Sequence, residues 1–256
     1  FTNGGRGGLF VQNYSDPTIN GALRVGVALS AANLDLKPET AKTKTLGFDW
    51  DLPLSQKTKL SLTWFDITYD NQIVGYLSDL TVLNREASFA GTGVIQRNPS
   101  ADLVAQLIAT YPTAAVLPAQ WTLFIDGRNK NLAKSVTQGV DFGLHTRIGA
   151  GSAGDFVFGL TGTWFTKYDV AVTPNSPMVD QLNTIFNPLK FKARASATWD
   201  HGPFSARLQL THVGGYRNTA ANPVQNVSSF NPVDLALSWK VGDLGSNNRL
   251  EKGLTF

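Results

Sequence analysis

The chain has no cysteine, so it holds neither a disulfide scaffold nor a thiolate metal site. Charged residues make up only 16% of its 256 residues, well below the roughly 25% of an average soluble domain. The net charge of +3 is spread along the chain, without the basic block that suggests nucleic-acid binding. No apolar run approaches the roughly 20 residues of a membrane-spanning helix. We therefore expect no disulfide, no nucleic-acid partner and no spanning helix.

Catalytic motifs are also absent. The chain lacks a Gly-x-Ser-x-Gly motif, a P-loop and a His-Glu-x-x-His motif. Three histidines stand apart, with no metal-ligand spacing among them: His145, His201 and His212. Asp49, Asp51 and Asp141 share the polar side of strand-like segments, and we interpret them as hydrated charges rather than as a general acid and base. We expect no enzymatic activity, no cofactor and no metal site.

The chain does contain many segments in which apolar and polar residues alternate. In the first, Leu46, Phe48 and Trp50 fall on one side and Asp49 and Asp51 on the other. A period of two predicts a strand with one apolar and one polar face, as in a soluble sandwich or a membrane barrel. Seven segments show it: 42–52, 58–69, 139–148, 156–164, 190–199, 204–211 and 233–241.

Two details of the pattern bear on the fold. In segment 58–69 the alternation breaks from Phe65 onward, which predicts either a bulge or an apolar patch on the polar face. Tryptophans stand at strand ends beside short turns, where a membrane barrel has its interfacial girdle: Trp50, Trp199 and Trp239. Core tryptophan is the alternative interpretation, but three at the same end of three strands are less readily explained that way.

Connection lengths favour the barrel. Turns of about four to six residues alternate with long links at 70–136, 169–188 and 214–230. Short turns at one end and long loops at the other are typical of outer-membrane barrels, whereas sandwiches mix their loop lengths. We therefore predict an all-β fold, an antiparallel transmembrane β-barrel segment of about seven or eight strands.

A family resemblance supports this prediction. Asn33-Leu-Asp-Leu-Lys-Pro-Glu39 resembles the Asn-Pro-Asp-Leu-Lys-Pro-Glu signature of the TonB-dependent outer-membrane receptors, with Leu34 replacing the usual proline. Segments 46–48, 139–142 and 233–235 are similar to strand motifs of that family. The resemblance covers the chain from about Asn33. It implies part of a plugged barrel of 22 strands, namely strands fourteen to twenty and the first residues of strand twenty-one near Gly253.

The resemblance also implies what surrounds this segment. Residues 1–256 would be part of a receptor barrel, without the signal peptide, plug, earlier strands and final strand. Because an arc of seven or eight strands leaves two unpaired edges, we expect it to belong to a larger barrel. Implied partners are lipid of the bacterial outer membrane, the protein's own plug domain, the TonB complex and a small nutrient ligand.

The implied function is TonB-dependent active uptake of a scarce nutrient, with this segment forming barrel wall and extracellular loops. Siderophores, cobalamin, oligosaccharides and metal chelates all remain open as substrates. Two alternatives remain. One is a passive porin-like barrel, and the other is a secreted β-rich adhesin or glycan-binding module with its apolar faces buried in a sandwich.

The 70–136 link would be a long extracellular loop, and it contains a helix signal. Ser100 supplies a cap after Pro99, and apolar residues at helical spacing predict a short helix near 100–110. This helix either packs the loop against the barrel rim or helps to capture ligand. Trp121 and Arg128 follow it, and we name them candidate ligand-binding residues because stacking and charge pairing suit a sugar or an iron chelate.

Overall fold

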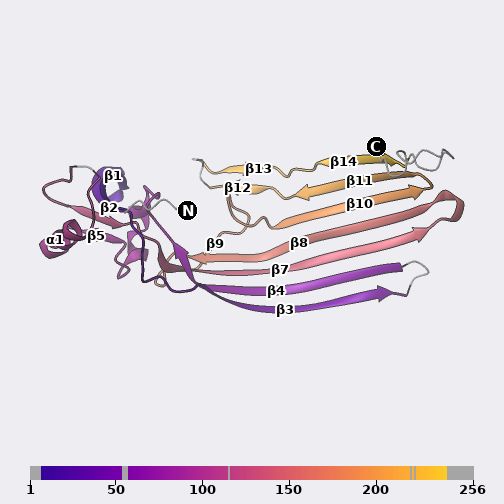
Figure 1. Ribbon diagram of the computed structural model, residues 1–256, viewed down its shortest axis with the longest axis horizontal. Helices are drawn as coiled ribbons and strands as arrows, with labels where there is room; N and C mark the ends of the chain where they lie inside the picture. The colour runs from indigo at the N-terminus through magenta and orange to yellow at the C-terminus, as the bar shows by residue number, and fades with distance from the viewer. Residues whose placement is uncertain (1–6, 54–56, 115, 220, 222, 241–256) are drawn as a thin grey trace, which may run out of the picture. The chain divides into compact units, whose positions relative to one another are not determined.

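The main sheet is a meander in which each long strand pairs with the next long strand along the chain (Figure 1). Its order is β14-β11-β10-β8-β7-β4-β3, and the short β9 (Val179–Asp180) pairs with β8 as well. The long strands are β3 (Thr40–Leu52), β4 (Lys57–Val74), β7 (Lys130–Gly149), β8 (Asp155–Ala171), β10 (Phe191–His201), β11 (Phe204–Val213) and β14 (Val233–Trp239). The seven predicted strands are confirmed.

This computed structural model describes residues 7–53, 57–114, 116–219, 221 and 223–240. The predicted start of a further strand near Gly253 lies outside the described residues. The chain divides into two units. Unit 1 comprises Phe1–Lys42, Thr68–Ser135 and Val170–Val179, and unit 2 comprises Thr43–Ile67, Val136–Asp169 and Asp180–Phe256.

Unit 1 contains a second, four-stranded sheet in the order β1-β2-β6-β5. Its strands are β1 (Leu9–Asp16), β2 (Ala22–Leu29), β5 (Ile95–Arg97) and β6 (Leu123–Asp126). β2 and β6 are parallel, whereas β1–β2 and β5–β6 are antiparallel. The β1–β2 hairpin was not among the predicted strands. Its connection holds the 3-10 turn η1 (Pro17–Ile19) followed by Asn20 and Gly21, which both have positive φ.

The predicted helix is present as α1 (Ala101–Thr110). The Ser100 side chain accepts a hydrogen bond from the Leu103 N–H at 3.3 Å and so caps the first turn. Leu107 is buried on the face that packs into unit 1, and the helix therefore contributes to a core. The connection between β4 and β7 is residues 75–129, shorter at both ends than predicted, because each strand extends beyond the alternating segment.

Two hydrophobic clusters form the core of unit 1. The first lies beneath β1, β6 and the 3-10 segment η2 (Val82–Phe89), and it consists of Tyr14, Tyr76, Val82, Leu83, Phe89, Val94, Leu123 and Ile125. The second brings α1 against β2 and β6, and it consists of Leu9, Val27, Leu29, Leu107, Trp121 and Phe124. Unit 1 is thus built like an ordinary folded domain, with its apolar side chains turned inward.

Unit 2 has the opposite arrangement, because the apolar face of its sheet is exposed. Leu235 is 66% exposed and Phe48 is 54% exposed. The register places such residues beside one another, since Leu208 pairs with Ala197 of β10 and with Leu235 of β14. A soluble sandwich would bury this face against a second sheet. An exposed apolar face opposite a charged one is the arrangement of a lipid-facing barrel wall.

Aromatic residues group at both ends of this apolar face. At the short-turn end, Trp239 stacks on Phe204 with ring centroids 5.9 Å apart, and the Trp199 indole N–H donates to the Ala153 carbonyl at 2.8 Å. At the other end, Phe191 pairs with Trp164 of β8 and stacks on Phe142 at 6.0 Å. The predicted strand-end tryptophans lie on the exposed surface, as an interfacial girdle requires.

The break in alternation at Phe65 corresponds to an apolar patch. The Phe65 ring meets Phe165 edge-on at 5.7 Å and is only 9% exposed. It fits there because position 139 is glycine: a Cβ at Gly139 would lie 2.6 Å from the Phe65 ring. Of the two alternatives that the sequence left open, the structure therefore contains the apolar patch.

The remaining elements are short. β12 (Tyr216–Asn218) and β13 (Gln225–Val227) form a two-stranded sheet, and the 3-10 turn η3 (Gly151–Ala153) joins β7 to β8. Over the part of the chain that the structure describes, none of the helices has the length and apolarity to span a membrane.

Candidate functional site

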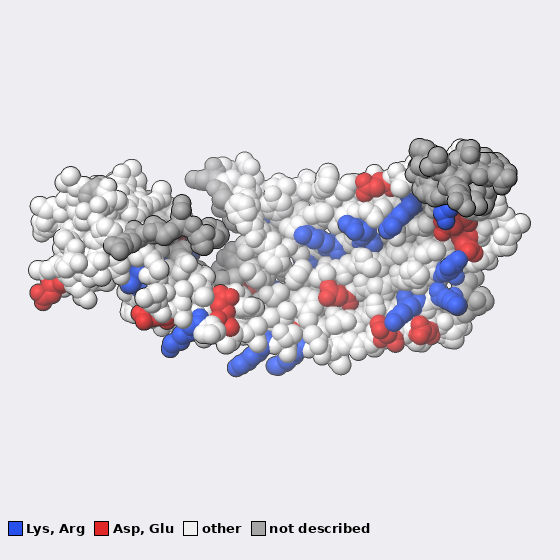
Figure 2. Space-filling model, in the orientation of Figure 1, with Lys and Arg blue, Asp and Glu red and all other residues white. Residues whose placement is uncertain are grey.

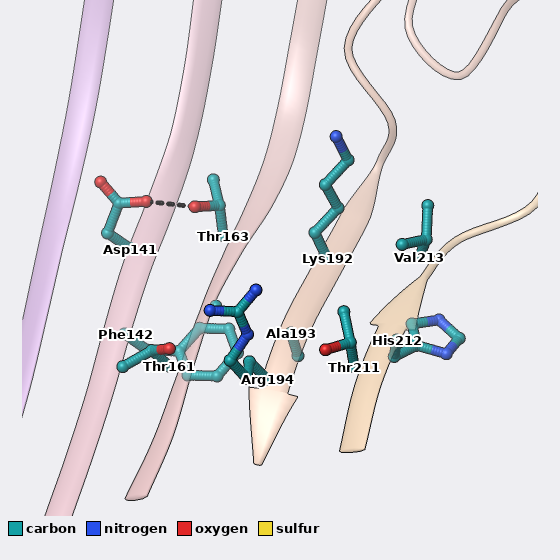
Figure 3. Close-up of a pocket in the computed structure, with 11 residues that line it drawn as sticks. Asp141, Phe142, Thr161, Thr163, Lys192, Ala193, Arg194, Thr211, His212 and Val213 are labelled. Carbon is teal, nitrogen blue, oxygen red and sulfur yellow. Dashed lines mark hydrogen bonds between the residues drawn. The ribbon is translucent and has the colours of Figure 1, made fainter. Parts of the chain in front are cut away.

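The polar face of the main sheet carries a broad pocket of about 450 Å³ over β7, β8, β10 and β11 (Figure 3). Strand register fixes its lining. Arg194 lies between Thr161 of β8 and Thr211 of β11, and Lys192 lies beside Thr163. A pocket that presents hydroxyl, guanidinium and ammonium donors together is suited to bind groups that accept hydrogen bonds.

Two of the three aspartates singled out on this face, Asp141 and Asp49, have partners, whereas Asp51 has no hydrogen bond or ion pair among the described residues. Asp141 accepts a hydrogen bond from the Thr163 hydroxyl at 2.6 Å, and Asp49 forms an ion pair with Lys59 at 3.0 Å. Within the described residues no group of three or more histidine or acidic side chains is arranged to hold a metal ion. The charges of this face are therefore partly paired with one another.

A second site lies in unit 1, around the predicted ligand residue Arg128. It lines a pocket of about 540 Å³ together with Tyr111, Asn33, Asp35, Ala31 and Pro112. The guanidinium donates to both Asp126 oxygens at 2.9 and 2.8 Å and to the Tyr111 hydroxyl at 3.1 Å. Arg128 also stands over the Tyr111 ring, 6.0 Å from its centroid. These contacts fix the guanidinium at the wall of the pocket.

The charges beneath this pocket stabilise one another. Burial of Asp126 favours its neutral form, but hydrogen bonds from Arg128 and Lys130 outweigh it and lower the pKa of the carboxyl. The same hydrogen bond to Asp126 raises the pKa of the Arg128 guanidinium. Both groups are therefore charged at neutral pH. The Asp126 carboxylate faces two cations, Arg128 and Lys130, while Asp35 adds a second carboxylate to the lining of the pocket.

Trp121, the other predicted ligand residue, is placed differently. Its side chain is 6% exposed and stacks on Phe124 with ring centroids 5.9 Å apart. It belongs to the cluster that also includes α1, and Tyr111 packs against that cluster from the Arg128 pocket. The structure thus gives Trp121 a core role and separates it from Arg128, and its contact with ligand stays a prediction.

The Asn33–Glu39 signature is held by residues that the sequence did not single out. The Asn131 side chain accepts from the Lys37 N–H at 2.7 Å and donates to the Lys37 carbonyl at 2.8 Å. Asn33 donates to the carbonyl of Asn129 at 2.8 Å, and the Glu39 carboxylate accepts from the Ile73 N–H at 2.6 Å. The signature therefore fixes the backbone that lines one side of the Arg128 pocket. The polar run Arg-Asn-Lys-Asn at residues 128–131 was the feature of the sequence that could have indicated these contacts.

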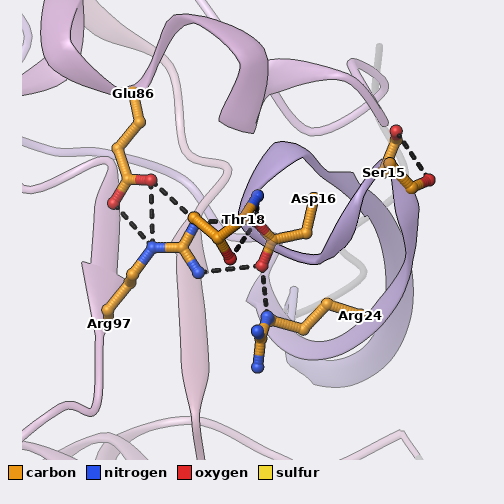
Figure 4. A network of polar contacts seen from close by, with 7 residues as sticks. Ser15, Asp16, Thr18, Arg24, Glu86 and Arg97 are labelled. Carbon is orange, nitrogen blue, oxygen red and sulfur yellow. Dashed lines mark hydrogen bonds and ion pairs between the residues drawn. The ribbon is translucent and has the colours of Figure 1, made fainter.

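A buried ionic network stabilises the fold of unit 1 (Figure 4). Asp16 is fully buried and accepts hydrogen bonds from Arg97 at 2.9 and 3.1 Å, from Arg24 and from Thr18. Arg97 also binds Glu86 of η2. The hydrogen bonds from Arg97 hold the pKa of the Asp16 carboxyl well below its usual range, against the opposing effect of burial. The network ties β1, β2, β5 and η2 together.

A known protein family matches almost the whole chain. The family model described as TonB dependent receptor-like, beta-barrel matches residues 1–255, so the family covers the first 32 residues as well as the signature. Among curated proteins, a search found no match.

Two solved structures share the fold. The siderophore receptor PirA from Acinetobacter baumannii superposes with a TM-score of 0.52 at 16% identity, covering 92% of this chain and 30% of PirA. A mutant of the ferric enterobactin receptor PfeA from Pseudomonas aeruginosa gives 0.52 at 12% identity, covering 92% and 28%. The chain thus spans less than a third of either receptor.

The meander order, the exposed apolar face and the family match agree. Receptors of this kind are transporters rather than enzymes, in line with the absence of catalytic motifs from the sequence. The chain belongs to the family of TonB-dependent receptor β-barrels.

Proposed function

We propose that the protein carrying this segment takes up a scarce nutrient across the bacterial outer membrane with energy delivered through TonB. The observation that carries the proposal is the division of the main sheet into an exposed apolar face and a charged polar face. In a receptor of this family the first face contacts lipid and the second lines a lumen that the plug domain fills. This segment then contributes wall and loops, and its role requires no covalent chemistry.

The dimensions of the apolar face support insertion in a membrane. From Phe191 to Trp199 the strand advances eight residues between the two aromatic groups. Eight residues rise about 26 Å along a strand, or about 20 Å across the membrane at a tilt of roughly 40°. The apolar band of outer-membrane barrels is about 25 Å tall, so the two aromatic groups sit near the two interfaces.

Unit 1 supplies the ligand-capturing side in this proposal. Most of it comes from the predicted 70–136 loop, which lies outside the cell if the short turns face the periplasm. Long loops with their own core are commonly functional. Arg128 is the proposed ligand contact, because Asp126 and Tyr111 hold its guanidinium at the wall of a pocket. Trp121 is retained as a candidate only.

The candidate substrates are siderophores, cobalamin, oligosaccharides and metal chelates. Siderophores come first for testing, because PirA and PfeA are described as receptors for such ligands. At 16% and 12% identity these two receptors support the fold and not a shared ligand.

The decisive experiment compares uptake with and without TonB. The full-length receptor is expressed in cells lacking other iron receptors, and accumulation of radioactive iron from a panel of ferric chelates is measured. We expect at least one chelate to accumulate only when TonB is present, and Arg128→Lys to weaken its binding because lysine lacks the bidentate fork. Accumulation that is equal without TonB would identify a passive porin instead.

A further inference from the structure

The β1–β2 hairpin of unit 1 has one apolar face that is covered at one end and open at the other. Residues paired across the two strands share a face, and on this face Leu9 pairs with Leu29 and Val11 with Val27. Leu9, Val27 and Leu29 are buried in the cluster to which α1 contributes Leu107. The face continues past Val11 and Val27 toward the turn, where its side chains are no longer buried.

Toward the turn the apolar side chains of this face are exposed. Leu23 is 68% exposed and Val25 is 50% exposed, although Val27, two residues further along β2, is buried. Leu80 is exposed as well, and its carbonyl accepts a hydrogen bond from the Ser15 N–H at 2.9 Å, which places it beside β1. We call these exposed residues the hairpin patch: Val11, Ile19, Leu23, Val25 and Leu80.

The charged residues of the hairpin lie on its other face. Asp16 and Arg24 share the face of Tyr14 and form an ion pair with each other. Asp79, which precedes Leu80, is paired with Arg85. In Figure 2, charged side chains stand over the main sheet, whereas the surface over β1 and β2 is uncharged. The hairpin patch is therefore apolar and has no charge of its own, as in the buried centre of an interface.

β2 has an open edge beside the hairpin patch. β6 pairs with β2 from Val27 to Leu29, and no strand of the described residues pairs with the same edge between Ala22 and Gly26. The backbone N–H and C=O groups along an open edge can pair with an added strand. An extended segment at this position would place alternate side chains against Leu23 and Val25.

Unit 1 already joins segments that are far apart in the chain. β2 and β6 come from different connections, and they pair in parallel within one small sheet. This chain covers 30% of PirA and 28% of the PfeA mutant. A complete barrel of this family therefore has further loops at the same end.

We propose that the hairpin patch is an interface within the receptor, covered by an extended apolar segment of another extracellular loop from the part of the receptor outside residues 1–256. This segment packs on Leu23 and Val25 and pairs with the open edge of β2, and it completes the cover that α1 begins. The inference rests on membership of the family and not on the transported ligand. It therefore holds or fails separately from the proposed uptake.

Photocross-linking in the full-length receptor on intact cells identifies what covers the hairpin patch. Benzoylphenylalanine replaces Leu23 in one variant and Val25 in another. The control replaces Val116, an apolar residue of unit 1 that is 95% exposed. We expect positions 23 and 25 to form a cross-link that leaves the receptor at its monomer mass and maps to a segment outside residues 1–256. Position 116 should give no such cross-link.

Thiol labelling measures the cover independently. Leu23→Cys and Val116→Cys are made in a receptor without other cysteines and are treated with a membrane-impermeant maleimide. Leu23→Cys should react about tenfold more slowly than Val116→Cys, because its thiol is reached only when the covering segment opens. In denaturant the two rates should agree. Val25→Cys takes the place of Leu23→Cys if that variant loses heat modifiability on gels.

Several results overturn the inference. They are equal labelling of positions 23 and 116 in the folded receptor, absence of a cross-link at both 23 and 25, and a cross-link to a second copy, to another protein, to a membrane glycolipid or within residues 1–256. A mapped cross-link in a receptor whose uptake does not need TonB would uphold the inference and overturn the proposed function. TonB-dependent uptake without the cross-link would do the reverse.

Discussion

The side-chain amide of Asn131 brackets the backbone of Lys37, accepting from its N–H at 2.7 Å and donating to its carbonyl at 2.8 Å. The same amide also donates to the Asn71 carbonyl at 2.8 Å. The Asn131 side chain thus forms with Lys37 the pair of hydrogen bonds that the backbone of a neighbouring strand would form. It also joins the signature to the ends of β4 and β7. A motif known for its sequence therefore has a physical role as a backbone clamp.

We predict that Asn131→Ala releases this clamp. Three hydrogen bonds are lost at about 1 kcal/mol each, so that local opening of the signature becomes easier by about 2–3 kcal/mol. Hydrogen–deuterium exchange of the Lys37 and Ile73 amides in the full-length receptor measures this opening. Asn13→Ala is the control, because Asn13 is exposed and its side chain has no hydrogen bond within the described residues. Unchanged exchange at Lys37 would contradict the clamp.

The hydroxyl of Tyr14 gives a second prediction. It is fully buried without a hydrogen-bond partner among the described residues, and burial, with the charge of Asp79, raises the pKa of Tyr14 to about 12. Tyr14→Phe should leave the free energy of unfolding of unit 1 unchanged or raise it by about 1 kcal/mol, since an unpaired polar group is removed.

Tyr76→Phe is the matched comparison for Tyr14→Phe. The Tyr76 hydroxyl donates to the Val172 carbonyl at 2.6 Å, so its removal should cost about 1 kcal/mol. Thermal unfolding of both variants of the full-length receptor separates the two cases. A larger loss for Tyr14→Phe than for Tyr76→Phe would mean that the Tyr14 hydroxyl has a partner.

Asp16 predicts how the stability of unit 1 depends on pH. Its folded-state pKa is depressed, so its stabilisation is complete above the unfolded value near 3.9 and is lost as pH falls below about 4 toward the folded value. Asp16→Asn should cost about 3 kcal/mol at neutral pH, because Arg97 and Arg24 lose their buried partner. Asp16→Asn should also make the stability of unit 1 depend less on pH below about 4. Amide exchange of β1 from pH 3 to 7 measures both effects.

The control for Asp16 is Asp102→Asn, which changes an exposed carboxylate in the first turn of α1. It should cost less than about 1 kcal/mol, the size of a helix-dipole interaction. An Asp16→Asn receptor as stable as the control would show that the network adds little.

Gly139 gives a prediction about the barrel wall. A Cβ at this position would lie 2.6 Å from the Phe65 ring, which is 9% exposed, and 2.8 Å from the backbone carbonyl of Trp164 on the neighbouring strand β8. Gly139→Ala should therefore cost about 1–3 kcal/mol and reduce the fraction of receptor that folds in detergent, as seen by heat modifiability on gels.

Gly143→Ala is its control on the same strand. There the Cβ would approach only the Ser61 hydroxyl, which donates a long hydrogen bond of 3.4 Å to the Gly143 carbonyl and can turn away at little cost, and no backbone atom lies close. Gly143→Ala should fold nearly as well as wild type. Equal folding of both variants would indicate that the groups around Gly139, such as the Phe65 ring, move enough to accommodate the extra methyl group.

Local patterns were enough to predict the wall. Alternation located the seven strands, because burial on one face alone imposes a period of two. Ser100 and the apolar spacing after it located α1, since a cap and an amphipathic stripe are short-range properties. The β1–β2 hairpin was missed, although Asn20-Gly21 is a turn signal between alternating runs.

Ligand residues were harder to predict, because exposure depends on what packs above a side chain. Trp121 and Arg128 lie seven positions apart in sequence, yet one is in the core and the other lines a pocket. Tyr111, which accepts a hydrogen bond from the Arg128 guanidinium, directly follows the predicted helix of residues 100–110, and no sequence pattern linked it to Arg128.

The sequence by itself determined the two-faced strands, their order and the family, because side-chain alternation, turn residues and the signature are all local along the chain. Only the tertiary structure decided which face is exposed, and that residues near the amino-terminal end and the long loop share one core. These properties depend on register and packing between residues far apart in the chain, which no local pattern encodes.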